Sequence, residues 1–149
     1  MQQLQAADSL NIPAITGGNV LQLTNSEAGA IVIGTPVYAF GNDAVKKAKA
    51  DAATTARIIG LVRDASITNG VPGSIQTDGT LALSTAQIDA VFGTTGGFTV
   101  GTVYYLSAAT AGIGTSTAPS AVGNLVVELG VAISTTEIIL SAPFKPILL

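Results

Sequence analysis

The sequence predicts an all-β domain, folded as a small β-barrel or sandwich, with one short helix and extended arms at both termini. Three observations carry this prediction. The chain contains 14 Ile, 13 Val and 18 Thr, which together supply 45 of its 149 residues, and β-branched side chains are stiff at χ1 and suit a pleated, half-buried surface. Its 17 glycines fit many tight turns. The apolar segments are short and separated by turn residues, which is typical of short strands.

The chain divides into three parts. Residues 1–19 are polar with scattered apolar side chains, and Pro13 and the Gly17-Gly18 pair oppose a regular element, so we expect an extended N-terminal arm. Residues 20–140 carry the strand pattern and form the β domain. Residues 141–149 form an extended C-terminal tail, because Pro143 prevents a central strand from continuing and no further strand is expected beyond residue 140.

Within the β domain, short apolar segments predict strands over residues 20–23, 30–33, 37–40, 44–49, 57–62, 71–76, 80–83, 102–106, 125–133 and 137–140. The segment Gly41-Asn42-Asp43 favours a tight turn that pairs the third and fourth strands. Residues 43–53 also have helix propensity, but their apolar positions are mostly Ala and would bury little, so the hairpin is favoured. Asp78-Gly79 predicts a type I′ hairpin loop between 71–76 and 80–83, and residues 108–118 are expected to form a loop.

One helix is predicted over residues 85–92. Ser84 can cap its first turn, Gln87 stands three residues later as in a capping box, and Gly93 can end it. Ile88, Val91 and Phe92 then share one face, which suits a helix that plugs a barrel end or covers a sheet edge.

The residue types exclude most catalytic chemistry. The chain has no Cys and no His, so a disulfide framework, a Cys/His metal site and a nucleophile with an imidazole base cannot form. Five carboxylates from residue 64 onward could in principle pair for glycosidic chemistry, but they are scattered over turns and strand ends: Asp64, Asp78, Asp89, Glu128 and Glu137. No loop has the spacing of a calcium site, and Gly112-Ile-Gly114 lacks the third glycine of a nucleotide loop. We therefore expect no enzyme activity, no catalytic residue, no cofactor and no metal.

The charge distribution argues against a nucleic-acid partner. The net charge is −3, and no Lys or Arg occurs from residue 64 to residue 144. The first half holds five basic residues that could form a patch: Lys46, Lys47, Lys49, Arg57 and Arg63. Strand alternation separates Lys46 from Lys47, and nearby carboxylates dilute the field, so a solvated edge is the favoured interpretation.

Low charge also favours assembly. Charged residues make up 10% of the chain, against about 25% in an average domain, and the mean hydropathy is +0.55. Because interface cores are depleted in charge, one explanation of the low charge is that part of the surface is buried against partner subunits. The other explanation is a stable β fold whose exposed faces are covered by Thr instead of charged residues. The sequence has no targeting segment and no apolar run long enough for a bilayer, so we expect synthesis in the cytoplasm and no membrane partner.

Two blocks of sequence resemble structural proteins of tailed phages. The first runs from Gly34-Thr-Pro-Val-Tyr through Ala44-Val-Lys-Lys-Ala and Arg57-Ile-Ile-Gly-Leu-Val to Gly70-Val-Pro-Gly-Ser-Ile-Gln-Thr-Asp-Gly. The second comprises Leu83-Ser-Thr-Ala-Gln-Ile-Asp-Ala-Val, Gly96-Gly-Phe-Thr-Val-Gly-Thr-Val-Tyr-Tyr-Leu-Ser, Pro119-Ser-Ala-Val-Gly and Val131-Ala-Ile-Ser. Over about residues 34–140 the chain is similar to capsid decoration (cement) proteins, and the second block is also similar to other phage structural proteins.

The resemblance implies a β-tulip-like domain, often a homotrimer, on the outside of a mature icosahedral head, where such proteins clamp neighbouring capsomers. The partners would be the major capsid protein and other copies of the chain, and the location would be the virion surface. A tail, fibre or baseplate component remains the alternative. A carbohydrate-binding module is a third interpretation, although the chain has no Trp for a sugar platform.

The two termini supply the candidate interface residues, because their apolar side chains lie outside the predicted strands: Leu4, Leu10, Ile12, Phe144, Ile147, Leu148 and Leu149. If these side chains were all exposed to solvent, they would form a hydrophobic patch prone to association. They either pack on their own domain or dock on a neighbouring subunit, and we expect at least one terminus to contact another chain.

Overall fold

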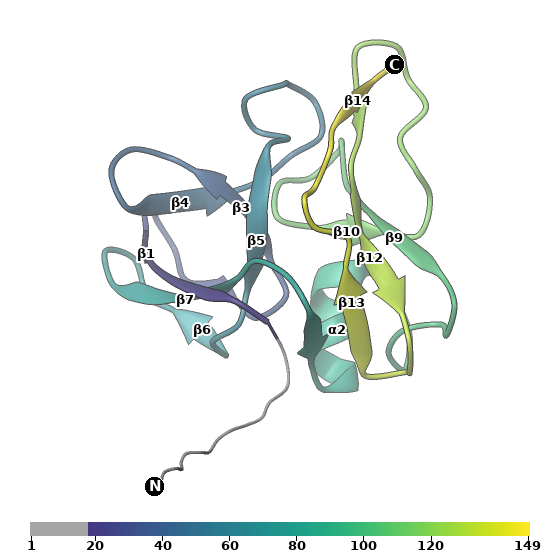
Figure 1. The fold of residues 1–149 in the computed structure, drawn as a ribbon, viewed down its shortest axis with the longest axis horizontal. Helices are drawn as coiled ribbons and strands as arrows, with labels where there is room; N and C mark the ends of the chain where they lie inside the picture. The colour runs from purple at the N-terminus through teal and green to yellow at the C-terminus, as the bar shows by residue number, and fades with distance from the viewer. Residues whose placement is uncertain (1–17) are drawn as a thin grey trace, which may run out of the picture.

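The computed structural model describes residues 18–149 and has the all-β fold that the sequence predicts. Figure 1 shows a barrel built by the first half of the chain beside an open sheet built by the second half, with helix α2 (Thr85–Phe92) at their junction. The expectations for the N-terminal arm, including Leu4, Leu10 and Ile12, lie outside the described residues.

Five short strands close the barrel, in the order β1-β4-β3-β5-β7. Their bounds are Val20–Asn25 for β1, Ala44–Lys47 for β4, Pro36–Ala39 for β3, Ile58–Val62 for β5 and Pro72–Gln76 for β7. β1 runs parallel to β4, and every other pair is antiparallel. A separate two-stranded sheet pairs β2 (Ile31–Val32) with β6 (Ser66–Ile67). The apolar side chains of one buried cluster come from these strands: Ile31, Val37, Val45, Val62, Ile67 and Ile75.

The second sheet is antiparallel and has the order β10-β9-β12-β13-β8. Its strands are Gly114–Thr115 for β10, Val103–Leu106 for β9, Glu128–Ala132 for β12, Glu137–Leu140 for β13 and Thr80–Ala82 for β8. A smaller sheet pairs β11 (Leu125–Val126) with β14 (Ile147–Leu148) near the C-terminus.

The main core joins the barrel to the second sheet. It combines buried side chains of β5, such as Ile58 and Leu61, with Ile88 and Val91 of α2 and with the inner face of the sheet. Phe92, Phe98 and Tyr104 form an aromatic cluster in this core, with ring centroids 5.0 to 5.5 Å apart. Edge-on and tilted ring contacts at these distances are favourable, so the helix is fixed against the sheet by its C-terminal end.

The helix has the termini that the sequence predicts. The Ser84 hydroxyl accepts a hydrogen bond from the backbone N–H of Gln87, and the Gln87 side chain accepts one from the backbone of Ser84. Gly93 ends the helix with φ +64°, a conformation that glycine adopts at little cost. The helix packs within the core between barrel and sheet.

The predicted hairpin at residues 37–49 is also confirmed. β3 and β4 pair antiparallel with Val37 opposite Lys47. The turn between them places Gly41 and Asp43 at positive φ, as a tight hairpin turn requires. The helical alternative for this segment is therefore wrong over residues 44–47.

The predicted hairpin around Asp78-Gly79 is wrong. β7 pairs with β1 and β5, whereas β8 pairs with β13. Both edges of β7 are occupied within the closed barrel, so β8 has no edge to join. The segment is instead a crossover, and the buried Gln76 side chain fixes it by donating to the carbonyl oxygens of Asp78 and Thr80 at 2.8 Å each.

The C-terminal end also differs from the prediction. The strand expected over 125–133 is divided into β11 and β12, and the loop expected over 108–118 contains β10. The expectation that no strand follows residue 140 is wrong, because Ile147 and Leu148 pair with β11. These two residues follow Pro146, so their N–H groups are free to form the ladder that a proline would interrupt.

Candidate interaction surface

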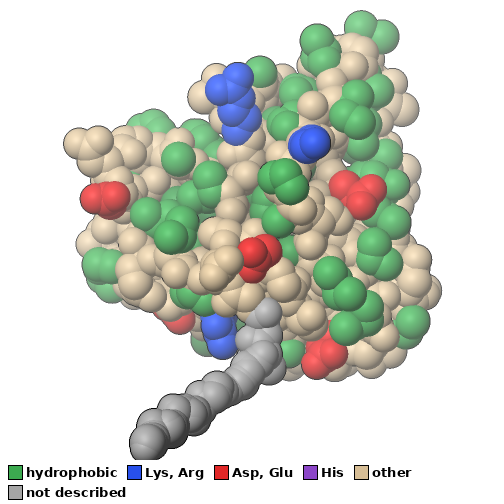
Figure 2. Space-filling model, viewed as in Figure 1, with side chains coloured by type: hydrophobic (Ala, Val, Ile, Leu, Met, Phe, Trp, Pro, Cys, Tyr) green, Lys and Arg blue, Asp and Glu red, His purple; other side chains and the backbone are tan. Residues whose placement is uncertain are grey.

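The small sheet of β11 and β14, together with the turn before β11, carries the three most exposed large apolar side chains of the described residues, and Leu149 follows them in the chain. Val122 is 93% exposed, Leu148 70%, Ile147 63% and Leu149 40%. We call these four residues the apolar tip. Figure 2 shows hydrophobic side chains gathered at the end of the molecule that carries the C-terminus.

Backbone hydrogen bonds hold the tip in place. The N–H of Leu149 donates to the carbonyl oxygen of Asn124 at 3.0 Å, and the N–H of Gly123 donates to that of Leu149 at 3.2 Å. Leu125 is buried on the opposite side, and its N–H donates to Ala50 at 2.9 Å. The tip therefore presents apolar side chains from a backbone that is tied to the main core.

The two segments that form the tip carry no charged side chain. Residues 108–127 and 146–149 contain no Asp, Glu, Lys or Arg. A surface with exposed aliphatic groups and no charge suits the centre of a protein interface, where charged residues are depleted.

The four candidate interface residues of the tail do not share one environment. Ile147, Leu148 and Leu149 belong to the tip, whereas Phe144 is half-buried and packs against the main core. Leu4, Leu10 and Ile12 lie in residues 1–17, which the structure does not describe. Sequence reasoning did not single out Val122; its signal is a large aliphatic residue in a turn-rich segment, between Pro119 and Gly123.

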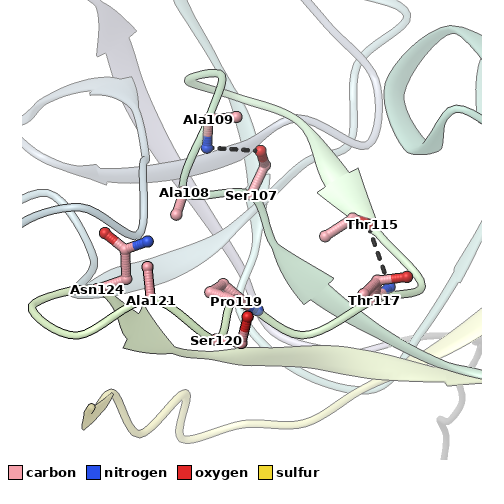
Figure 3. Close-up of a pocket in the computed structure, with 9 residues that line it drawn as sticks. All are labelled: Ser107, Ala108, Ala109, Thr115, Thr117, Pro119, Ser120, Ala121 and Asn124. Atoms are coloured by element: carbon pink, nitrogen blue, oxygen red, sulfur yellow. Dashed lines mark hydrogen bonds between the residues drawn. The ribbon is translucent and has the colours of Figure 1, made fainter.

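A shallow hollow lies beside the tip (Figure 3). Its volume is about 390 Å³, and it is lined by small side chains: Ser107, Ala108, Ala109, Thr115, Thr117, Pro119, Ser120, Ala121 and Asn124. The Ser107 hydroxyl accepts from the N–H groups of Ala109 and Thr110, and the Thr115 hydroxyl accepts from that of Thr117, each at 3.1 Å. These hydroxyls shape turns, and no acid, base or aromatic side chain lines the hollow, so it offers a complementary shape rather than reactive groups.

Four of the five candidate carboxylates accept hydrogen bonds from their own chain. Asp64 accepts from the N–H of Ser74 at 2.9 Å, Asp78 from the backbone and side chain of Asn19, and Glu128 from the Ser141 hydroxyl at 3.0 Å. Asp89 accepts from the Thr94 hydroxyl at 2.6 Å and from two glycine N–H groups, and its pKa is lowered, first by the Thr94 hydrogen bond. These carboxylates therefore hold neighbouring segments of the fold together. Among residues 18–149, no three metal-ligating side chains gather into a site.

The basic residues of the first half have separate contacts. Lys49 pairs with Asp51 at 2.9 Å, and this hydrogen bond is the largest cause of the lowered pKa of Asp51. The ammonium group of Lys46 lies 4.1 Å from the centre of the Phe40 ring. Both contacts are local to the β3–β4 region and its following loop, as expected of solvated basic side chains on strand edges.

No family model matches the chain, and no curated protein matches it either. Within the described part of the chain, no helix has the length and apolar character needed to cross a membrane.

Proposed function

We propose that the protein is a structural virion protein of a tailed phage, which decorates the outside of the head and stabilises the contacts between capsomers. The sequence resemblance over residues 34–140 supports this proposal, and the all-β fold is consistent with it. The observation that carries a binding role is the uncharged apolar tip, with Val122, Ile147 and Leu148 each more than 60% exposed.

The proposed partners are the major capsid protein and other copies of the chain. Burying a single Val or Leu side chain stabilises a contact by roughly 1.5–3 kcal/mol, which is small against the cost of association. A trimer that presents three tips to a repeating lattice would bind more tightly through multivalency. Weak individual contacts are therefore sufficient for a protein that binds many equivalent sites.

Fractionation of virions tests the location. Particles are separated into heads and tails, and the protein is quantified in each fraction with an antibody. We expect to find the protein in the head fraction, in many copies. We also expect that it can be removed from the heads without loss of the major capsid protein. Recovery with the tails alone would contradict decoration and support the tail, fibre or baseplate alternative.

A glycan array with the purified protein tests the third alternative. If the protein decorates the capsid, we expect no saturable binding to any glycan on the array. Saturable binding to one sugar class, together with absence from virions, would replace the proposal with a carbohydrate-binding module.

A further inference from the structure

The turn between β6 and β7 contains the one Asn-Gly pair of the sequence. Asn69 precedes Gly70, whereas none of the other five asparagines precedes a glycine. Both residues are exposed, and Figure 1 shows the turn at the surface of the half of the molecule that holds the barrel. Glycine has no Cβ, so its backbone nitrogen can approach the preceding side chain closely. The Asn69 side chain is therefore open to deamidation, the conversion of its amide to a carboxylate.

The fold requires the glycine that exposes Asn69 to this reaction. The N–H of Val71 donates to the carbonyl oxygen of Thr68 at 3.0 Å and closes the turn, and Gly70 has φ +77°. A positive φ at the third position is typical of a type II turn, which glycine adopts at little cost. A side chain at position 70 would be strained by this backbone conformation, although a Cβ there would meet nothing within 4 Å.

Two hydrogen bonds hold the reacting groups on other partners. The backbone N–H of Gly70 donates to the carbonyl oxygen of Asn25 at 2.8 Å. The Asn69 amide donates to the carbonyl oxygen of Glu27. Asn25 is 0% exposed, and its own N–H donates to the Val71 carbonyl at 3.1 Å. The Gly70 nitrogen must leave the Asn25 carbonyl before it can reach the Asn69 side chain, so the reaction needs local opening of the turn.

We propose that Asn69 is a site of spontaneous deamidation, with water as the co-reactant, and that opening of the β6–β7 turn sets its rate. In the open turn the Gly70 nitrogen attacks the Cγ carbon of Asn69 and gives up its proton. The new bond from this nitrogen to Cγ closes a succinimide ring, the bond from Cγ to the side-chain nitrogen breaks, and that nitrogen leaves with the proton as ammonia. Water then opens the ring at either carbonyl carbon, which gives aspartate or isoaspartate at position 69.

Either product weakens the turn. A carboxylate has no N–H to donate to the Glu27 carbonyl, and its oxygens would face that carbonyl instead. Isoaspartate also adds a methylene to the backbone before Gly70, which moves the Gly70 N–H away from Asn25. The reaction changes the net charge from −3 to −4, so ion-exchange chromatography separates the modified protein. This chemistry belongs to the chain itself and does not rest on the proposed virion function.

Incubation of the full chain at mildly alkaline pH tests the proposal. Peptide mapping by mass spectrometry measures the deamidation rate at each asparagine, once in buffer and once in a urea concentration that unfolds the protein. Asn42 is the internal control, because it is also exposed in a turn but is followed by Asp43 instead of a glycine. Asn69→Gln is the matched variant: it keeps an amide donor, but its longer side chain would have to close a larger ring. Circular dichroism verifies that the variant is folded.

We expect deamidation at Asn69 in the folded chain to be faster than at Asn42, and slower than at Asn69 in urea by at least about tenfold, because the turn must first open. We expect Asn69→Gln not to form the more acidic species. A rate at Asn69 no higher than at Asn42, or the same acidic species from Asn69→Gln at an unchanged rate, would overturn the site. Equal rates at Asn69 in buffer and in urea would overturn the control by the turn.

The melting temperature of the modified protein tests the effect on the turn. The acidic species is purified from the incubated chain and compared with the unmodified protein. We expect it to melt at a lower temperature, because the hydrogen bond to Glu27 is lost. Equal melting temperatures would overturn the proposed weakening of the turn.

Discussion

Asp89 holds the loop that follows α2. Its two carboxylate oxygens accept three hydrogen bonds, from the Thr94 hydroxyl and from the N–H groups of Gly96 and Gly97. Hydrogen bonds to the ionised form stabilise it, which is why the pKa of this carboxyl is lowered. The loop lies directly before Phe98 of the aromatic cluster, so this single side chain supports the packing of the core.

The first prediction concerns this carboxylate. Asp89→Asn should lower the melting temperature at pH 7, because the amide cannot replace both acceptor oxygens. A lowered folded-state pKa means that the contribution is present above the ordinary value of 3.8 and is lost as the pH falls through the folded value. Melting curves of the two proteins should therefore converge below pH 3.8. A difference that is the same at pH 7 and at pH 2 would contradict this account of the loop.

Two glycines provide a matched test of packing. A Cβ at Gly114 would collide with the Phe92 ring, whereas a Cβ at Gly29 would meet nothing within 4 Å, and neither glycine has a positive φ. Gly114→Ala should destabilise the protein by about 1–3 kcal/mol through overpacking. Gly29→Ala should be neutral or slightly stabilising. Urea titrations of both variants measure the difference in the free energy of unfolding. Equal free energies of unfolding would mean that β10 does not pack closely against the aromatic cluster.

At the scale of elements, helix α2 shows how a local signal can determine a structure. Its capping box joins Ser84 and Gln87 in both directions. Ser84→Ala should cost about 1 kcal/mol, or roughly 2–4 °C in melting temperature for a domain of this size. Ser84→Asp keeps an acceptor and should restore most of the loss. An alanine variant as stable as the original protein would show that tertiary packing alone fixes the start of the helix.

Local signals also explain what the sequence could and could not predict. The helix ends and the β3–β4 turn depend on residues close together in the chain, and both were predictable. The Asp78-Gly79 turn has an equally clear local pattern. However, both edges of β7 are paired, one with β1 and the other with β5, and neighbouring residues in the sequence do not indicate these long-range pairings. Strand β14 depends on a partner strand 21 to 23 residues earlier in the chain, so the tail has no strand signal of its own.

The candidate surface was predictable only in part. The apolar residues of the tail indicate an interface because they lie outside the predicted strands, and three of them are exposed at the tip. The sequence does not indicate Val122 as an interface residue, because a single aliphatic residue in a turn is common on protein surfaces. The exposure of Ile139 depends on the pairing of β13 within the sheet, because an aliphatic run such as Ile138-Ile139 does not indicate which side chain faces outward.

For the whole molecule, we predict a homo-oligomer, with a trimer expected. Light scattering on the purified protein at micromolar concentration should give three times the 14.8 kDa mass of the chain, because closed symmetry buries the same apolar patch at each contact. If the measured mass is that of a monomer, a trimer could form only on the particle. Imaging of decorated particles would then have to show threefold clusters, and isolated single copies would contradict the prediction.

The apolar tip is the central claim, and binding to undecorated heads tests it most directly. The double variant Val122→Ser/Leu148→Ser is compared with the unchanged protein and with Leu21→Ser, which removes an exposed aliphatic side chain from the barrel. Occupancy is measured by co-sedimentation over a range of protein concentrations, and circular dichroism verifies that each variant is folded. Two aliphatic groups removed from a buried contact should weaken binding at least about tenfold, while Leu21→Ser should bind as the unchanged protein does. Equal binding by all three proteins would contradict the account.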